Sequence, residues 1–507
     1  MHLWLKNLKN VTIDFDQNHW VTVLIGWNGT GKSNVLEALA IIFRDLMDDK
    51  KKSPPFAYRL SYKIGVGSAE RSVWLNADPD RTDEPLVIHT STPGTVELDT
   101  RESQGRRITL AEFRRPTNNL LPKYIFSYYS GESHRMFDVF RPYLETYDNQ
   151  LRNGRDPGMK RLFFALPVHS QFVLLAFLIQ QNDTVRAFLN DHFGIDPDEG
   201  VESVLFVIKK PPWKSRAPDG DERFWNARGV VKDFLARLYD ISLAPFRLHR
   251  TVAKTIWAKG RSEFLYLYVK DMQALRKLVG SDAPSSFFRD LESTYVSELI
   301  DEVLIRVRLR NGEAVTFREL SEGEQQLLTV LGLLRFTASE ESLFLLDEPD
   351  THLNPRWCVD YLDYLHRFVG FDRDAEATSH IVLTTHNPLA IAELKKEQVQ
   401  ILRMRETGTG RCINAVHPEL DPRGQGYGAI VTSDMFGIAS SLDKSTQELL
   451  EEQRLLAGRE SLTANEQRRL DDLNAQLERL GFRFFLPDDE YSRFLRLRHD
   501  RLRKLFD

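Results

Sequence analysis

The sequence predicts an α/β protein built on a parallel sheet, and three observations point to that class. The apolar run Val21–Ile25 is typical of a strand buried on both faces. A glycine-rich turn follows it, and apolar residues then recur at helical spacing between Asn34 and Phe43. Far along the chain, the apolar runs Leu343–Leu346 and Ile381–Thr385 have the same strand character. Parallel strands need long crossover connections, usually helices, and this order of elements supplies them.

Composition limits the function before any motif is considered. The chain has 507 residues and a mass of 58.7 kDa, which fits three or four domains, or one large domain with insertions. Lys and Arg number 68 and Asp and Glu 73, so the net charge of −5 excludes a histone-like polycation but allows a local basic groove. The only cysteines, Cys358 and Cys412, exclude a disulfide framework and a cysteine zinc site.

The sequence also leads us to expect a soluble, cytoplasmic protein. Its N-terminus lacks the apolar stretch of a signal peptide. The longest apolar stretch, Leu162–Ile179, is interrupted by Pro167, His169 and Gln171, whereas a membrane-spanning helix needs about 20 nearly unbroken apolar residues. We expect this stretch to form a buried helix.

The glycine-rich turn has the pattern GxxxxGK[ST], which runs from Gly26 to Ser33 between a strand and a helix. Glycines let successive backbone N–H groups converge on phosphate oxygens, and the helix N-terminus adds its positive dipole end. Lys32 would reach the β- and γ-phosphates of ATP, and the Ser33 hydroxyl would ligate Mg²⁺. The predicted ATP-binding residues are Gly26, Asn28, Gly29, Thr30, Gly31, Lys32, Ser33 and Asn34.

A second motif is the pair of acids that ends the strand Leu343–Leu346. Asp347 would hold Mg²⁺ through water, and Glu348 would orient and polarise the water that attacks the γ-phosphate. Alone this is a weak signal, because acids after strands are usually solvated turn residues. Three further motifs strengthen it: Leu320–Gln326 precedes it, Asp350–Pro355 follows it, and Thr384–Asn387 ends the next strand.

Taken together, these motifs resemble the ATP-binding-cassette (ABC) ATPases of the RecF/SMC-like branch, with Walker A, the LSxGxxQ signature, Walker B, the D-loop and the switch histidine in order. The resemblance implies a two-lobed P-loop NTPase head that binds ATP and Mg²⁺. The residues it marks as catalytic are Glu348, His386 and Lys32, and those that hold the metal are Ser33 and Asp347. The residues it places against ATP held by an opposite subunit are Ser321, Gly323, Glu324 and Asp350. Two copies of the chain would then form a head-to-tail dimer.

The chain departs from the pattern of this branch in two places. Lys32 and Ser321 are 289 residues apart, which is too far for a transporter subunit, and the intervening region lacks the sustained heptads of an SMC coiled coil. No convincing glutamine marks a Q-loop; the segment Tyr124–Arg135 takes its place. This segment either senses nucleotide through Glu132 or Arg135, or is a plain strand and turn, and both interpretations stay open.

A narrower resemblance rests on GWNGTGKSNVLEAL, YYSGESHR, LSEGEQQLL and LFLLDEPDTHLNP. These segments are similar to the restriction-associated AAA family ATPases that serve as the ATPase subunits of Septu-type antiphage systems. The resemblance implies a sensor subunit that controls a separate HNH-type nuclease, in a dimer that can assemble further. No glutamate-then-DxD nuclease pattern follows His386, so we expect no nuclease site in this chain. The alternatives are a RecF-like DNA repair ATPase without a nuclease partner, and a scaffold that binds ATP but scarcely hydrolyses it.

We therefore expect four parts. They are an ATPase lobe I at 1–130, a mostly helical insertion at 131–310, an ATPase lobe II at 311–435 and a C-terminal helical, partner-binding appendage at 436–507. In the appendage, Thr463 with Glu466 predicts a capping box at a helix start. The leucines of that helix form one apolar stripe and predict a helical hairpin: Leu470, Leu473, Leu477 and Leu480.

Two stretches of the insertion mix basic and aromatic residues, as segments that bind nucleic acid do. The candidate nucleic-acid contacts are Lys209, Lys210, Trp213, Lys214, Arg250, Lys254 and Lys259. A solvated loop and a solvated helix face are the simpler account of each stretch taken alone. The segment Arg493–Phe506 is a basic amphipathic helix, for which packing or partner docking is favoured over DNA contact.

Overall fold

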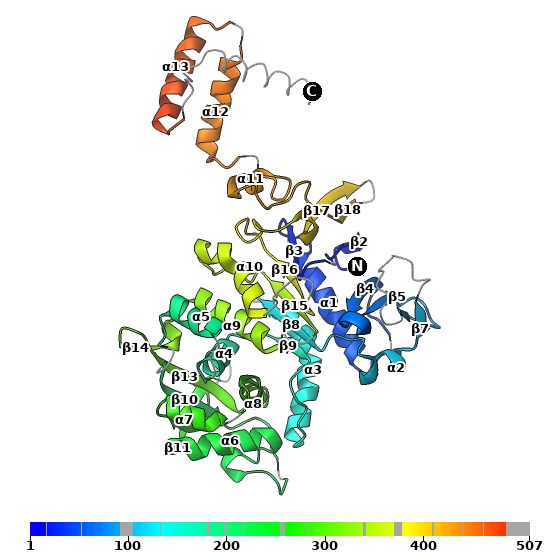
Figure 1. Cartoon of the computed structure of the whole chain (residues 1–507), viewed down its shortest axis with the longest axis vertical. Coiled ribbons are helices and arrows are strands. Elements are labelled where there is room, and N and C mark those ends of the chain that lie inside the picture. Colours follow the sequence, from blue (N-terminus) through cyan, green and yellow to red (C-terminus); the bar gives the residue numbers. More distant parts are fainter. Residues whose placement is uncertain are drawn as a thin grey trace. The chain divides into compact units, whose positions relative to one another are not determined.

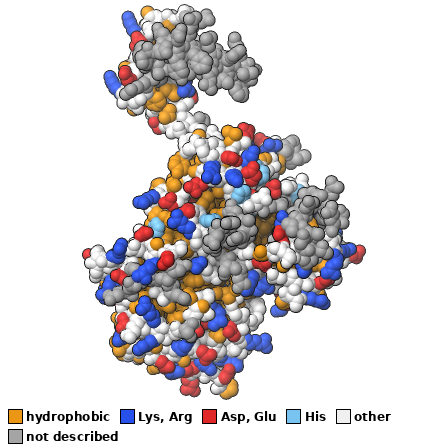
Figure 2. Space-filling model, viewed as in Figure 1, with side chains coloured by type: hydrophobic (Ala, Val, Ile, Leu, Met, Phe, Trp, Pro, Cys, Tyr) orange, Lys and Arg blue, Asp and Glu red, His pale blue; other side chains and the backbone are white. Residues whose placement is uncertain are grey.

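The computed structural model describes residues 1–16, 18–51, 53–91, 105–131, 133–179, 183–196, 200–215, 217–253, 259–280, 282–337, 341–369, 378–407, 410–438, 440–459 and 461–482. Two compact units, Met1–Tyr427 and Gly428–Asp507, make up the chain (Figure 1). Across the described ranges, no helix combines the length and the apolar character that crossing a bilayer requires. Figure 2 shows basic and acidic side chains interspersed on the face in view, as expected from the near balance of charges.

The first unit is organised around a seven-stranded sheet in the order β18-β17-β3-β16-β15-β8-β9. All neighbours in it are parallel except β17 and β18. Its strands are β3 (Val21–Gly26), β8 (Tyr124–Tyr129), β9 (Leu162–Phe164), β15 (Ser342–Asp347), β16 (His380–Thr384), β17 (Val399–Thr407) and β18 (Gly410–Val416). Every residue of β3 is buried, which confirms the predicted central strand. Strands that precede the insertion (β3 and β8) and strands that follow it (β15 to β18) thus lie in one sheet.

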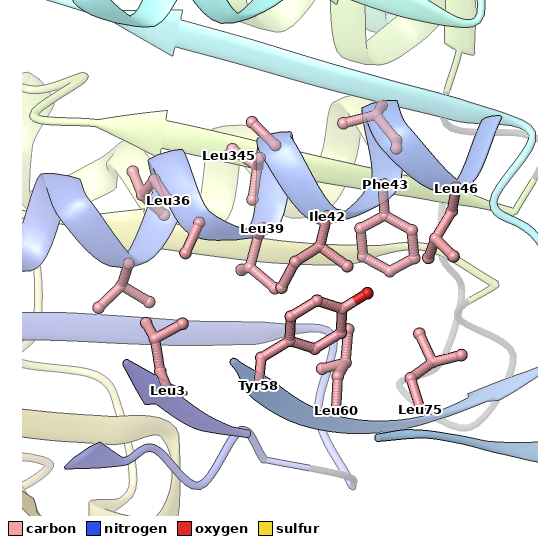
Figure 3. Packing of buried hydrophobic residues seen from close by; sticks show 14 of the residues in the cluster. Leu3, Leu36, Leu39, Ile42, Phe43, Leu46, Tyr58, Leu60, Leu75 and Leu345 are labelled. Atoms are coloured by element: carbon pink, nitrogen blue, oxygen red, sulfur yellow. The ribbon is translucent and has the colours of Figure 1, made fainter. Parts of the chain in front are cut away.

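A second, antiparallel sheet packs against the other side of the first helix. Its order is β2-β1-β4-β5-β6-β7. Its strands are β1 (His2–Leu5), β2 (Leu8–Thr12), β4 (Tyr58–Ile64), β5 (Arg71–Ala77), β6 (Leu86–Thr90) and β7 (Arg106–Ile108), and the short helix α2 (Leu110–Phe113) follows. Figure 3 shows how side chains of α1 (Lys32–Met47), including Leu39, Ile42 and Phe43, meet Tyr58 and Leu60 of this sheet. Burying each such side chain stabilises the fold by about 1.5–3 kcal/mol, so α1 is held firmly between the two sheets.

The region at 131–310 contains helices and also most of an antiparallel sheet, so it is less helical than we expected. Its helices are α3 (Arg135–Arg152), α4 (Val168–Ile179), α5 (Asp183–Phe193), α6 (Gly229–Ile241), α7 (Met272–Val279) and α8 (Pro284–Val296). The sheet has the order β11-β12-β10-β13-β14. Its strands are β10 (Val201–Lys209), β11 (Leu243–Ala253), β12 (Lys259–Val269), β13 (Ile300–Arg308) and β14 (Ala314–Thr316). The apolar stretch Leu162–Ile179 divides into strand β9 and the buried helix α4.

Two helices of the cassette pack on each other, and one of them packs on α4 of the insertion. Helix α9 (Glu322–Thr337) packs on α4 so closely that a Cβ added at Gly332 would lie 2.0 Å from Val173 Cγ1. Helix α10 (Pro355–Val369) packs on α9 and follows the D-loop. The signature therefore lies at the start of α9, and the D-loop immediately precedes α10.

The second unit is a helical hairpin, as the leucine stripe predicted. After α11 (Tyr427–Thr432), which starts at the boundary, its helices are α12 (Lys444–Ala457) and α13 (Ala464–Arg479). The Thr463–Glu466 capping box is present at the start of α13. Leu473 and Leu477 are fully buried, whereas Leu480 at the helix end is 56% exposed. The predicted basic helix Arg493–Phe506 lies outside the described residues.

Candidate nucleotide-binding site

The turn between β3 and α1 has the backbone shape of a phosphate-binding loop. Gly26 has φ +148°, and a Cβ there would lie 2.4 Å from the carbonyl oxygen of Leu402 on the neighbouring strand. Gly31 has φ +92° at the cap of α1. Both positions therefore require glycine. The Thr30 hydroxyl donates to the Trp27 carbonyl oxygen at 2.8 Å and closes the turn. The first N–H groups of a helix have no partner within the helix, so the N-terminus of α1, directly after this turn, is suited to binding an anion.

Lys32 reaches back from the first turn of α1 toward the end of its own strand. Its side chain donates to the Gly26 carbonyl oxygen at 2.9 Å, and its Nζ lies 2.7 Å from Nε2 of His386. Burial lowers the pKa of Lys32, and the nearby carboxylates of Glu348 and Asp347 oppose that shift. The amine is thus held in a partly buried position beside the expected phosphates.

Asn34, a predicted ATP contact, is tied into the loop by both ends of its side chain. Its Nδ2 donates to Asn7 Oδ1 at 2.7 Å, and its Oδ1 accepts from Arg135 Nη1 at 3.1 Å. Asn7 in turn donates to the Gly29 carbonyl oxygen at 2.9 Å. Asn7 lies in the short turn between β1 and β2, where no motif marked it. Arg135 reaches the loop from the start of α3, while Glu132 lies outside the described residues.

Asp347 ends β15 and is 1% exposed. The hydroxyl of Thr384, on the adjacent strand β16, donates to its Oδ1. Its Oδ2 is buried without a hydrogen-bond partner among the described residues. Burial raises the pKa of this carboxyl, and the hydroxyls of Thr384 and Ser33 oppose the shift. An orphaned carboxylate oxygen beside the Ser33 hydroxyl fits the oxygen-ligand chemistry of Mg²⁺, so the residues present suit the predicted cation.

Glu348 follows directly and adopts φ +50°, an uncommon conformation for a non-glycine residue. Its N–H donates to the Thr384 carbonyl oxygen at 3.0 Å, which fixes this turn against β16. Its Oε1 lies 3.1 Å from His386 Nε2. The hydrogen bond from His386 lowers the pKa of Glu348, and the Lys32 charge adds to the effect. The carboxylate is therefore held ionised at the mouth of the site, as a water-activating group requires.

The predicted D-loop acid points inward. Asp350 is 5% exposed, and its Oδ2 accepts from the Thr385 hydroxyl at 2.7 Å. Burial raises its pKa, and the hydrogen bonds from Thr385 and Asn387 oppose the shift. The carboxylate thus joins the D-loop to the end of β16. Contact of this residue with a second subunit stays a prediction.

The signature segment forms the start of α9. Ser321 and Glu324 make a capping box in which Glu324 Oε2 accepts from the Ser321 N–H at 2.7 Å and from its hydroxyl at 2.9 Å. A Cβ at Gly323 would lie 2.3 Å from the His352 carbonyl oxygen, so glycine lets the signature helix touch the D-loop segment of the same chain. Ser321 itself is exposed. It is therefore available to a second chain.

Three neighbouring parallel strands thus bring distant motifs together. β3 leads into the P-loop, β15 ends at the Walker B acids, and β16 leads to His386; all end at the same edge of the sheet. Ligands of α/β sheets bind at the carboxyl ends of the strands. Asn28, also predicted to bind ATP, is exposed in the loop.

The candidate nucleic-acid residues are dispersed and partly engaged within the chain. Trp213 donates from Nε1 to the Ser297 carbonyl oxygen at 2.9 Å, and the Arg152 guanidinium lies 5.5 Å from its ring centre. Lys209 and Arg250 each lie 3.4 Å from a carboxylate oxygen of Asp301. Exposed side chains without an ion pair in the described ranges are Lys210, Lys214 and Lys259; Lys254 lies outside them. Trp213 is thus a packing residue here.

Two family models match the chain. One, described as "AAA ATPase domain", matches residues 5–133. The other, described as "AAA domain, putative AbiEii toxin, Type IV TA system", matches residues 257–392. The first covers the P-loop, and the second covers the signature, the Walker B acids and the switch histidine.

Two curated proteins are similar to parts of the chain. Protein ea59 of Escherichia phage lambda is 29% identical over 118 residues, which is 23% of this chain and 20% of that protein. Septu protein PtuA of Bacillus mycoides (strain KBAB4) is 23% identical over 200 residues, which is 37% of this chain and 27% of that protein. The matched part thus spans about a fifth to a quarter of the length of these relatives.

Among solved structures, SMC head domains align with much of the chain. The Pyrococcus furiosus head, bound to the C-terminal domain of ScpA, has 13% identity and a TM-score of 0.28, covering 81% of this chain and 94% of that one. The Thermotoga maritima head has 11% identity and a TM-score of 0.27, covering 81% and 95%.

Proposed function

We propose that this chain, an ABC-type P-loop ATPase of the RecF/SMC-like branch, is the ATP-binding and ATP-hydrolysing sensor subunit of an antiphage defence complex. In this proposal it controls a separate nuclease of the HNH type through a nucleotide-dependent head-to-tail dimer. The observation that carries the ATPase part is the convergence of Lys32, Glu348 and His386 at one sheet edge. The partial similarity to Septu protein PtuA supports the defence setting.

The side chains at the sheet edge have distinct tasks in this reaction. The N–H groups of the P-loop and the Lys32 ammonium hold the phosphates. Ser33 and Asp347 would hold Mg²⁺, which when bound neutralises charge on the β- and γ-phosphate oxygens. Glu348 accepts a proton from the attacking water, and His386 positions that carboxylate through their contact at 3.1 Å.

The dimer supplies the remaining contact. Ser321 is exposed at the N-terminus of α9, whose dipole favours an anion. In a head-to-tail pair, this helix end would cap the triphosphate that the P-loop of the opposite chain holds. Hydrolysis removes the γ-phosphate, which weakens the cap and lets the two chains separate. The signature contacts the D-loop segment of the same chain through Gly323 and His352. Closure of the dimer around one ATP would therefore shift the residues that contact the other ATP.

Co-expression with the protein encoded by the adjacent gene tests this proposal. We expect a nuclease to co-purify with the chain and its DNA cleavage to respond to ATP. In the Lys32→Ala variant ATP binding and this response are both lost, whereas the exposed control Lys50→Ala retains them. A chain that shows DNA-stimulated ATPase activity but binds no nuclease would instead be a repair ATPase. A chain that binds ATP but does not turn it over would be a scaffold.

A further inference from the structure

The chain that follows β8 brings Arg135 to the nucleotide site. Strand β8 lies beside β15 in the central sheet, and its last residue, Tyr129, is paired with Asp347. The N–H of Ser130 donates to the Asp347 carbonyl oxygen at 3.2 Å. The chain therefore leaves β8 at the same sheet edge as the acid that we predict to hold Mg²⁺. Arg135 follows as the first residue of α3.

The Arg135 guanidinium lies against the first turn of α1. Its Nη1 donates to Asn34 Oδ1 at 3.1 Å, and Asn34 directly follows Ser33, the other predicted Mg²⁺ ligand. Burial raises the pKa of Asp347, and the positive charge of Arg135 is one of the influences that oppose this rise. Mg²⁺ in such sites bridges the β- and γ-phosphates. The guanidinium is thus on the side of the P-loop where the terminal phosphate is expected.

The positive charge of Arg135 is only partly compensated. The carboxylate that forms its ion pair in the described part of the chain is Glu37 on α1, at 3.7 Å from Nε. Lys6 Nζ already donates to both oxygens of Glu37, each at 2.6 Å, so two cations share one carboxylate. The Arg135 side chain is 37% exposed, and its guanidinium has five N–H donors, of which the described residues accept one. Charge and donors therefore remain for an anion.

Arg135 is not needed to hold α3 on α1. The two helices are joined further along by Arg44, whose Nη1 donates to the Val139 carbonyl oxygen at 3.1 Å. Met136, Val139 and Phe140 of α3 are buried in the hydrophobic cluster to which α1 also contributes. A substitution of Arg135 therefore changes the charge at the site and leaves this packing in place.

We propose that Arg135 binds the terminal phosphate of ATP and makes the site prefer ATP to ADP. A guanidinium presents paired N–H donors that match phosphate oxygens, and its charge strengthens these hydrogen bonds. ADP lacks the γ-phosphate, so it does not gain this contact. The proposal rests on the nucleotide site proposed above and adds the residue that distinguishes the two nucleotides. In it, the segment Tyr124–Arg135 senses nucleotide through Arg135.

Competition against a fluorescent ADP analogue, with Mg²⁺ present, tests the proposal on the full chain. It measures the affinities of ADP and of the non-hydrolysable ATP analogue AMP-PNP. We expect Arg135→Ala to weaken AMP-PNP binding about 10–100-fold and ADP binding less than about threefold. Arg135→Gln, whose amide can still donate to Asn34 but carries no charge, loses as much. The matched control is Arg141→Ala on the same helix, because Arg141 is 54% exposed and pairs with Asp138. It leaves both affinities unchanged.

The outcomes separate this proposal from the function on which it rests. Lys32→Ala lowers the affinity for both nucleotides, whereas Arg135→Ala lowers only that for AMP-PNP, and neither result depends on hydrolysis or on a nuclease. An original chain that binds neither nucleotide would remove the nucleotide site, and this proposal with it.

Three results would overturn the role of Arg135 alone, given equal thermal midpoints for all variants. The first is equal AMP-PNP affinity of Arg135→Ala and Arg141→Ala. The second is a parallel loss of AMP-PNP and ADP affinity in Arg135→Ala. The third is an Arg135→Gln variant that keeps the original AMP-PNP affinity, because the side chain would then act only by holding Asn34.

Discussion

Nε2 of His386 lies 2.7 Å from the Lys32 ammonium and 3.1 Å from Glu348 Oε1. A single imidazole nitrogen either accepts a hydrogen bond or donates one, so the two contacts are alternatives. With Lys32 turned toward a phosphate, Nε2 is free to donate to Glu348. We therefore predict that occupation of the P-loop is coupled to the position of the Glu348 carboxylate, which we propose activates water.

His386→Ala tests this coupling. The variant loses the hydrogen bond that orients Glu348 but keeps the P-loop, so we expect kcat for ATP hydrolysis to fall about 100-fold with little change in ATP affinity. Steady-state phosphate release and binding of a fluorescent ATP analogue measure the two quantities. His249→Ala, an exposed histidine of the insertion, serves as the control. An unchanged kcat in His386→Ala contradicts the coupling.

Thr384→Val removes the hydroxyl that donates to Asp347 and accepts from the Glu348 N–H at 3.1 Å. The Glu348 N–H keeps its bond to the Thr384 carbonyl oxygen, but leaving the buried Asp347 oxygen unpaired costs about 1–3 kcal/mol. We expect the Mg²⁺ concentration for half-maximal nucleotide binding to rise about 10-fold, and Thr384→Ser to restore it. Thr385→Val, which acts on Asp350 instead, leaves the Mg²⁺ requirement unchanged. If the Val and Ser variants at 384 behave alike, the hydroxyl has no such role.

Ser321→Arg separates ATP binding from subunit closure. The bulky cation stands where the signature serine would cap the phosphate of the opposite chain, while the P-loop of its own chain is untouched. We expect ATP affinity within a factor of about three of the original, and no ATP-dependent dimer in light scattering. Loss of ATP binding by the isolated variant chain would instead place Ser321 at its own P-loop.

Burial lowers the pKa of His380, at the start of β16, from 6.5 to about 4. Between these pH values the unfolded chain binds a proton at this residue and the folded chain does not, so the free energy of unfolding falls as the pH falls. The contribution is at most about 1.4 kcal/mol per pH unit. Denaturant unfolding at a series of pH values should show a shallower dependence in His380→Gln. An identical slope would show that His380 does not titrate in this way.

The nucleotide site was predictable because its motifs are local. The glycines of the P-loop and the acids after β15 have fixed spacings, and their backbone conformations, such as φ +92° at Gly31, follow from the residue types. The contacts of Asn7 with the P-loop and of Thr384 with Asp347 were not predicted, because they depend on which strands become neighbours. A hydroxyl or an amide in a strand or turn has no special pattern until the sheet is assembled.

The sheet of the insertion also could not be predicted from local sequence. Strands β10 (Val201–Lys209) and β13 (Ile300–Arg308) are paired although 90 residues separate them in the sequence, and such long-range pairing leaves little local signal. Trp213 was a candidate stacking residue for bases, yet its indole N–H and its ring are both used inside the chain. The exposed aromatic rings instead lie on β11 and β12, at Phe246 and Tyr268.

The mass of the Glu348→Gln variant in solution tests the central claim most directly. This variant keeps every predicted phosphate contact but lacks the carboxylate that we propose activates water. We expect light scattering to give the monomer mass without nucleotide and twice that mass with ATP and Mg²⁺, a dimer that persists because hydrolysis is blocked. A variant that stays monomeric with ATP bound, or that hydrolyses ATP at the original rate, would contradict the account.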